Sequence, residues 1–201
     1  MAGERVPGDS VPPGTQEDLP VVVGSRSTYA GAVVSIRIDR LRRSDNELIE
    51  REVVDHPGAV VIAALDARGK VVLVRQYRHA VGRTLLELPA GTLDPGEDPA
   101  DAAVRELREE TGLIAAKWDS LGSFFSSPGF LHEELHAFLA RDLTTVGQDL
   151  DDDEDIHLVT ESLADLLTTP EVIRDAKTLA TLLLLERLLA AEGAHTETAE
   201  E

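Results

Sequence analysis

Apolar and polar residues alternate in the first patterned stretch of the chain, with apolar side chains at every second position from Val34 to Ile38. A period of two is typical of a half-buried strand. A second strand is expected at 48–54, after a polar turn at 43–46. The short apolar run 59–65 and the similar segment 71–74 predict a hairpin with at least one buried strand.

The spacing of apolar residues then changes, and several independent signals predict a helix from Pro99 to Thr111. Asp98 is a favourable N-cap, Pro99 suits the first helical position, and Gly112 suits the left-handed residue that ends many helices. Val104 and Leu107 are expected to anchor this helix to the sheet. The other expected elements are strands at 85–88, 118–124, 135–139 and 156–159, and a long helix at about 170–189 that Thr169 and Pro170 begin.

Strands flanked by two long helices, without regular alternation of strand and helix, predict the fold class. We expect an α/β (α+β) fold in which a mixed β-sheet is sandwiched between α-helices, with an N-terminal antiparallel strand pair. Residues 1–24 are expected to be a disordered tail and residues 192–201 an acidic tail. A single domain is expected at 25–191, with its N-terminal strands at about 30–55.

Composition narrows the function classes. The 201 residues are 42% hydrophobic, enough for one sizeable core, and the net charge of −19 argues against a nucleic-acid polymer or an anionic membrane surface as partner. The absence of cysteine excludes disulfides, thiolate nucleophiles and cysteine-based zinc sites. Because no signal-like segment or long apolar run is found, we expect a cytoplasmic protein.

Three carboxylates on the predicted helix carry the candidate chemistry. Glu106, Glu109 and Glu110 are spaced i, i+3, i+4, which places them on one face, where like charges repel unless a cation lies among them. Oxygen ligands without Cys or paired His favour Mg²⁺ or Mn²⁺. Arg105 has the rigid fork that suits pinning a glutamate, and Glu97 is placed to hold the preceding loop or to join an outer metal shell.

This stretch resembles the signature of the Nudix hydrolase family. That signature is Gly, five residues, Glu, seven residues, Arg-Glu-apolar, one residue, Glu-Glu, one residue, Gly-apolar. Every fixed place is filled, by Gly91, Glu97, Arg105, Glu106, Leu107, Glu109, Glu110, Gly112 and Leu113. The resemblance implies a metal-dependent pyrophosphohydrolase that acts on a nucleoside diphosphate linked to another group.

Segments outside the signature resemble the ADP-ribose pyrophosphatase branch of that family. They are 51–60, Arg-Gln-Tyr-Arg at 75–78, Glu-Leu-Pro-Ala-Gly at 87–91 and Ser-Pro-Gly-Phe at 127–130, with Pro128 lying 16 residues after Gly112. The branch implies hydrolysis of ADP-ribose to AMP and ribose 5-phosphate by attack of water on a phosphorus atom. It also implies a homodimer whose N-terminal strands exchange between subunits.

The family pattern assigns roles to individual residues. Metal ligands are expected at Glu106 and Glu110, with Glu109 sharing and the carbonyl of Ala90 completing the shell. The implied catalytic residues are Glu154 as the base on an acidic loop at 149–155, together with Glu109 and Arg105. The implied substrate-binding residues are Arg51, Arg78, Glu87, Gly129 and Phe130, of which Arg78 contacts a phosphate and the last two lie near the terminal ribose.

The sequence leaves several alternatives open. Asp152 or Asp153 replaces Glu154 as the base if the loop register differs. Another nucleotide sugar or nucleoside diphosphate derivative is an alternative substrate, and a sensor that binds ADP-ribose without cleaving it is an alternative function. His132 and His136 are read as incidental, because an i, i+4 pair does not converge on a strand or turn.

Overall fold

The computed structural model describes residues 19–147, 156–169 and 171–197, which divide into two compact units, Met1–Asp55 and His56–Glu201. The first unit is an antiparallel sheet of β1 (Val21–Ala30), β2 (Ser35–Arg42) and β3 (Leu48–Asp55). The two strands predicted from alternation are confirmed as β2 and β3. β1 begins inside the segment expected to be a tail, and the sequence does not predict it. Both faces of this strand are exposed, so its apolar residues do not alternate with polar ones in a period of two.

The second unit contains a mixed sheet with the strand order β11-β5-β4-β10-β8. β10 runs parallel to β4, while β8, β5 and β11 pair antiparallel with their neighbours. Two short strands extend it, since β6 pairs with β5 and β7 pairs with β4. The bounds are β4 Ala59–Leu65, β5 Val71–Arg78, β6 Arg83–Glu87, β7 Ala90–Thr92, β8 Leu113–Phe125, β9 Leu131–His132, β10 Glu134–Thr145 and β11 Ile156–Glu161, with a 3-10 turn at His79–Val81.

The first helix, α1 (Pro99–Thr111), has the predicted bounds. The Asp98 side chain accepts a hydrogen bond of 2.8 Å from the N–H of Ala100, and Gly112 adopts a φ of 67° at the other end. Leu107 is fully buried, but Val104 is 47% exposed, so the expectation that Val104 anchors the helix is wrong.

The C-terminal helices differ from the expectation. A short helix, α2 (Leu163–Thr168), ends at Thr169, and α3 spans Ala176–Glu197. α3 begins after Asp175 because that carboxylate accepts hydrogen bonds from the N–H and the hydroxyl of Thr178, which caps the helix. Its end lies within the segment expected to be an acidic tail. Among the described residues, no helix is long and apolar enough to cross a membrane.

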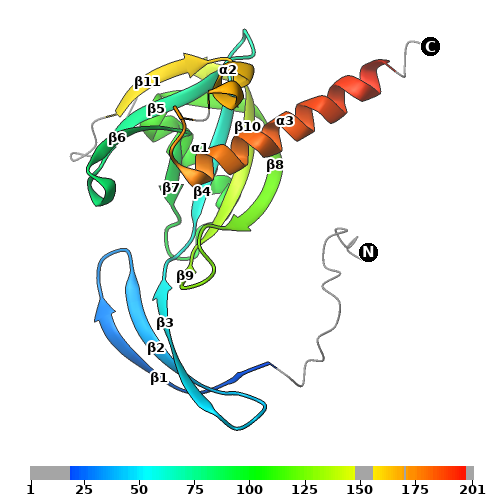
Figure 1. Cartoon of the computed structure of the whole chain (residues 1–201). Helices are drawn as coiled ribbons and strands as arrows, with labels where there is room; N and C mark the ends of the chain where they lie inside the picture. The colour runs from blue at the N-terminus through cyan, green and yellow to red at the C-terminus, as the bar shows by residue number, and fades with distance from the viewer. Residues whose placement is uncertain (1–18, 148–155, 170, 198–201) are drawn as a thin grey trace. The chain divides into compact units, whose positions relative to one another are not determined.

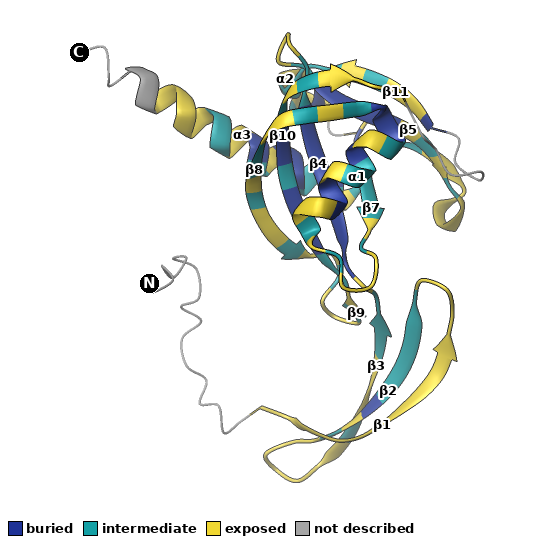
Figure 2. Cartoon of the chain, turned by 180° about the vertical axis from the view of Figure 1, so that it is seen from behind, coloured by how far each residue is buried: buried dark blue, intermediate teal, exposed yellow. Residues whose placement is uncertain are grey.

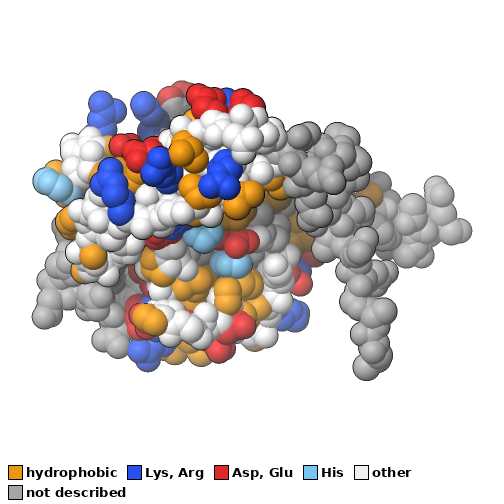
Figure 3. Space-filling view, turned by 90° about the horizontal axis from the view of Figure 1, so that it is seen from below, with side chains coloured by type: hydrophobic (Ala, Val, Ile, Leu, Met, Phe, Trp, Pro, Cys, Tyr) orange, Lys and Arg blue, Asp and Glu red, His pale blue; other side chains and the backbone are white. Residues whose placement is uncertain are grey.

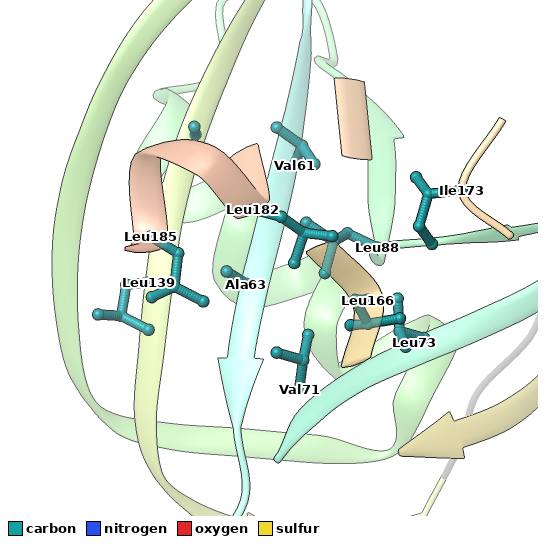
Figure 4. Packing of buried hydrophobic residues seen from close by; sticks show 11 residues of the cluster. Val61, Ala63, Val71, Leu73, Leu88, Leu139, Leu166, Ile173, Leu182 and Leu185 are labelled. Carbon is teal, nitrogen blue, oxygen red and sulfur yellow. The ribbon is translucent and has the colours of Figure 1, made fainter. Parts of the chain in front are cut away.

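The core lies on both faces of the sheet, which confirms the predicted arrangement of a mixed sheet between helices. α1 covers one face and α3 the other (Figures 1 and 2). Alternate residues of β4 point to opposite sides: Val61 and Ala63 pack with Leu182 and Leu185 of α3 (Figure 4), whereas Ile62 packs with residues of α1. Burial on both faces explains why β4 is an unbroken apolar run rather than an alternating one.

Candidate active site

The buried carboxylate of Glu110 fixes α1 to strand β7. The side chain is 3% exposed, and its Oε2 accepts a hydrogen bond of 3.1 Å from the N–H of Ala90. The predicted ligands Ala90 and Glu110 are therefore adjacent, although twenty positions separate them in the sequence. β7 is held in turn by antiparallel pairing with β4, in which Val61 lies opposite Ala90.

Glu106 lies one helical turn before Glu110 and packs directly on Gly91. A Cβ added at Gly91 would overlap the carboxylate carbon and both carboxylate oxygens of Glu106. The φ of Gly91 lies outside the left-handed region, so glycine leaves space for the Glu106 carboxylate here and is not needed for backbone conformation. The motif has glycine at this position because the backbone of β7 approaches the Glu106 carboxylate closely.

Arg105 connects the carboxylates of this helix with the preceding loop. Its Nε and Nη2 each donate to Glu97 at 2.9 Å, and its Nη1 donates to Glu106 at 2.7 Å and to Glu109 at 3.1 Å. Hydrogen bonds from Arg105, with one from the N–H of Asp94, lower the pKa of Glu97 to about 2. The same bonds to Glu97 and Glu106 raise the pKa of Arg105. Arg105 is thus a fixed cation, and Glu97 holds the loop as expected from the sequence.

A second charged group surrounds Glu87, which is 1% exposed at the end of β6. Arg78 on β5 donates to it with Nε at 3.0 Å and Nη2 at 2.9 Å, and Lys177 on α3 also pairs with it. Burial alone would raise the pKa of Glu87, but the hydrogen bonds from Arg78 and the charge of Lys177 outweigh it and lower that pKa. The hydrogen bond to Glu87 also raises the pKa of Arg78.

A pocket of about 330 Å³ lies beside the charged group around Glu87. Its lining includes the backbone of β7 at Ala90 and Gly91, and the cations Arg78 and Lys177. Glu133 and Ser126 line it from the segment before β10. The pocket thus joins two cations to the strand backbone on which Glu106 and Glu110 pack, and the carboxylates of Glu133 and Asp175 also line it. This arrangement suits a phosphate group bridged to the helix by metal.

The remaining predicted site residues lie in different places. Arg51 lies on β3 in the N-terminal unit, exposed, and its guanidinium donates to the carbonyl of Glu50 at 2.9 Å. Gly129 and Phe130 belong to the turn before β9, where Phe130 is 55% exposed. Glu154, with Asp152 and Asp153, lies outside the described residues.

Sequence reasoning missed Lys177, Asp175 and Glu133 as pocket residues. Lys177 reaches Glu87 across 90 positions, and it pairs with Asp175 at 3.0 Å. A lysine in the first turn of a helix carries no recognisable local pattern. Only the packing of α3 against the sheet brings it to the site.

The carboxylates around Arg105 suit a divalent cation in charge and chemistry. When all are ionised, the four carboxylates and the one guanidinium of Arg105 leave three negative charges, the carboxylates being those of Glu97, Glu106, Glu109 and Glu110. Carboxylate and carbonyl oxygens are the ligands that hard cations prefer. Within the described ranges, no three His, Asp or Glu side chains converge on one point where a metal ion would sit. Arg105 lies among these carboxylates instead, bonded to three of them.

Comparisons with known proteins identify relatives of this chain. The chain is 37% identical over 160 residues to the ADP-ribose pyrophosphatase of Bacillus subtilis, which covers 78% of this chain and 86% of that protein. It is 45% identical over 127 residues to the ADP-ribose pyrophosphatase of Mycobacterium tuberculosis, covering 63% and 61%. It is also 35% identical over 168 residues to the methanol dehydrogenase activator of Bacillus methanolicus, covering 82% and 91%.

A solved structure of an ADP compounds hydrolase shares the fold, with a TM-score of 0.77 and 23% identity over 87% of this chain and 96% of that one. The family model described as NUDIX domain matches residues 54–182, a span that contains α1, β7 and the pocket. Nudix hydrolases are generally dependent on a divalent metal. The carboxylate helix, the glycine that it packs on and this match together show that the chain belongs to the NUDIX domain family.

Proposed function

We propose that this protein is a divalent-metal-dependent pyrophosphohydrolase that cleaves ADP-ribose to AMP and ribose 5-phosphate. The observation that carries the proposal is the carboxylate face of α1, which packs on the backbone of β7 at the edge of a pocket with two cations. The names of two relatives point to the same substrate. A diphosphate is strongly anionic, so it requires cations to approach Glu106 and Glu110.

The residues of this chain divide the work in the proposed reaction. Glu106 and Glu110, with Glu109 and the carbonyl of Ala90, would hold Mg²⁺ or Mn²⁺, which when bound neutralises phosphate oxygens and lowers the pKa of water. Arg105 keeps the carboxylates in place, and Arg78 faces the pocket as a phosphate contact. One water oxygen bonds to phosphorus, the bridging P–O bond breaks, and the base takes the proton from water.

A substrate panel tests the proposal. ADP-ribose, other nucleotide sugars and nucleoside triphosphates are assayed in parallel, each with Mg²⁺ and with Mn²⁺, and the products are identified by chromatography. We expect AMP and ribose 5-phosphate from ADP-ribose with the highest kcat/KM. A preference above about tenfold for another compound contradicts the substrate assignment. Calorimetric binding of ADP-ribose without release of AMP would establish the sensor instead.

Glu110→Gln tests the metal role. Glutamine keeps an oxygen that accepts the hydrogen bond from Ala90 but removes the charge, so we expect a folded protein with turnover reduced by at least about 100-fold. Glu186→Gln, on the exposed side of α3, is the matched control and should keep full activity. An unchanged rate in Glu110→Gln would remove this residue from the metal shell.

Glu154 is proposed as the general base. Glu154→Gln should lower kcat by about two orders of magnitude with little change in KM, because general-base catalysis contributes that much. Asp152→Asn and Asp153→Asn are the comparison variants. If one of them loses activity while Glu154→Gln keeps it, the base is that aspartate.

We also propose a cytoplasmic homodimer whose N-terminal strands exchange between subunits. Val21, Val22 and Tyr29 on β1 are each more than half exposed, which leaves apolar surface for a second copy to cover. Light scattering coupled to size exclusion should give twice the 21.7 kDa chain mass. A mass of one chain at micromolar concentration contradicts the dimer.

A further inference from the structure

Three arginines near the β5–β6 hairpin form no ion pair within the described ranges. Arg75, Arg83 and Arg174 are exposed, and no carboxylate in the described part of the chain pairs with any of them. Figure 3 shows that Lys and Arg side chains do stand on the surface of this acidic protein, beside hydrophobic and acidic ones. Unpaired arginines alone are ordinary on a surface, so the position of these three is what distinguishes them.

The three arginines lie at two adjoining hollows, of which Arg75 lines only the first. One, of about 350 Å³, is lined by all three together with Thr84 and Glu171. The other, of about 400 Å³, shares Arg83, Leu85 and Arg174 with the first. Arg83 and Arg174 therefore face both hollows, although 91 positions separate them. The hollows lie on a different set of residues from the pocket at Ala90 and Gly91.

The lining specifies the kind of ligand. Three guanidinium cations and the one carboxylate of Glu171 leave two positive charges, which match a phosphate monoester dianion. Thr84 adds a hydroxyl donor. Val81 and Val172, 57% and 46% exposed, supply apolar surface beside the cations, which suits the ring of a nucleoside or sugar.

We infer that these hollows form a second binding site, for a small phosphate monoester, outside the catalytic pocket. The net charge of −19 favours a small anion over a polyanion, because a nucleic acid would meet repulsion from the rest of the surface. The second site does not depend on the proposed hydrolysis of ADP-ribose, although both products of that reaction are phosphate monoesters.

Arg83 and Arg174 each lie next to a residue that lines the catalytic pocket. Arg174 precedes Asp175, which caps α3 and pairs with Lys177. Arg83 lies opposite Arg78 in the β5–β6 register. A ligand held by Arg83 and Arg174 would therefore restrain the two segments that carry the cations of the pocket.

The test measures binding directly in the full-length protein. AMP, ribose 5-phosphate and inorganic phosphate are titrated by calorimetry in EDTA, so that no divalent metal helps anions into the carboxylate site. We expect AMP or ribose 5-phosphate to bind at one per chain, with affinity that falls as salt rises. Arg83→Ala/Arg174→Ala should weaken binding by at least about tenfold, and each single variant by less.

Two control variants separate this site from nonspecific charge attraction and from binding in the catalytic pocket. Arg68→Ala removes an exposed arginine that lines neither hollow, and it should leave the affinity unchanged. Arg78→Ala removes a cation of the catalytic pocket and should keep at least half of the affinity. Circular dichroism checks that each variant is folded. Loss of binding in Arg78→Ala but not in the double variant, or no binding by the wild type, overturns the inference.

Discussion

Gly91→Ala is the sharpest single test of how α1 and β7 form the site. The added Cβ would overlap three atoms of the Glu106 carboxylate, whereas an ordinary Cβ contact lies at 3.4–4 Å. The carboxylate therefore has to retreat by more than about an ångström or the strand has to shift. The backbone of Gly91 can accommodate alanine, since its φ lies outside the left-handed region. The whole effect of the substitution thus comes from displacing Glu106.

The magnitude follows from this displacement. A catalytic group misplaced by about 1 Å costs on the order of 100-fold in rate. The atoms that must move are the end of the flexible Glu106 side chain, so we expect a much smaller effect on the free energy of unfolding than on the rate. We expect kcat/KM for ADP-ribose to fall by about 100-fold at saturating Mg²⁺. The apparent metal affinity should weaken as well, because Glu106 is a proposed ligand.

The assay combines steady-state kinetics with urea unfolding in a double-mutant cycle. In a Glu106→Ala background the clash partner is gone, so Gly91→Ala should add less than about 0.5 kcal/mol. Gly24→Ala is the matched control, because that strand glycine has open space around its Cβ position. Wild-type activity and metal affinity in Gly91→Ala would refute the close packing of Glu106 on β7.

Two further predictions concern pH and the attachment of α3. Arg105 lowers the pKa of Glu97 from 4.5 to about 2, so the stability that ionised Glu97 contributes is complete above about pH 4.5 and is lost as pH falls through 2. The difference in unfolding free energy between the wild type and Glu97→Gln should therefore shrink over that range, and a difference that grows toward acid would contradict the ion pair. Thr178→Val should lower the free energy of unfolding by about 1–3 kcal/mol, because the buried hydroxyl accepts a hydrogen bond from the N–H of Leu88 at 2.9 Å. The control Thr160→Val, at an exposed position of β11, should change it by less than about 0.5 kcal/mol. Equal effects of the two valine substitutions would show that the bond to Leu88 contributes nothing.

The sequence by itself determined those features whose cause is local. The bounds of α1 follow from Asp98 and Gly112, since caps act within a single turn. The carboxylate face of the helix follows from its period, and the buried strand β4 follows from its unbroken apolar run. The resemblance to the family implied that Ala90 and Glu110 share one site, and the hydrogen bond between them is a finding of the structure.

Tertiary structure alone decided the features that join distant positions. The sequence implied a phosphate contact for Arg78 but not its partner: the pairing of β5 with β6 brings it to Glu87, and the packing of α3 adds Lys177. α3 begins at Ala176 and not near Pro170 because Asp175 supplies the cap, a choice that local propensity left open. Strand register and helix packing set these contacts, and neither is encoded in the spacing of any short segment.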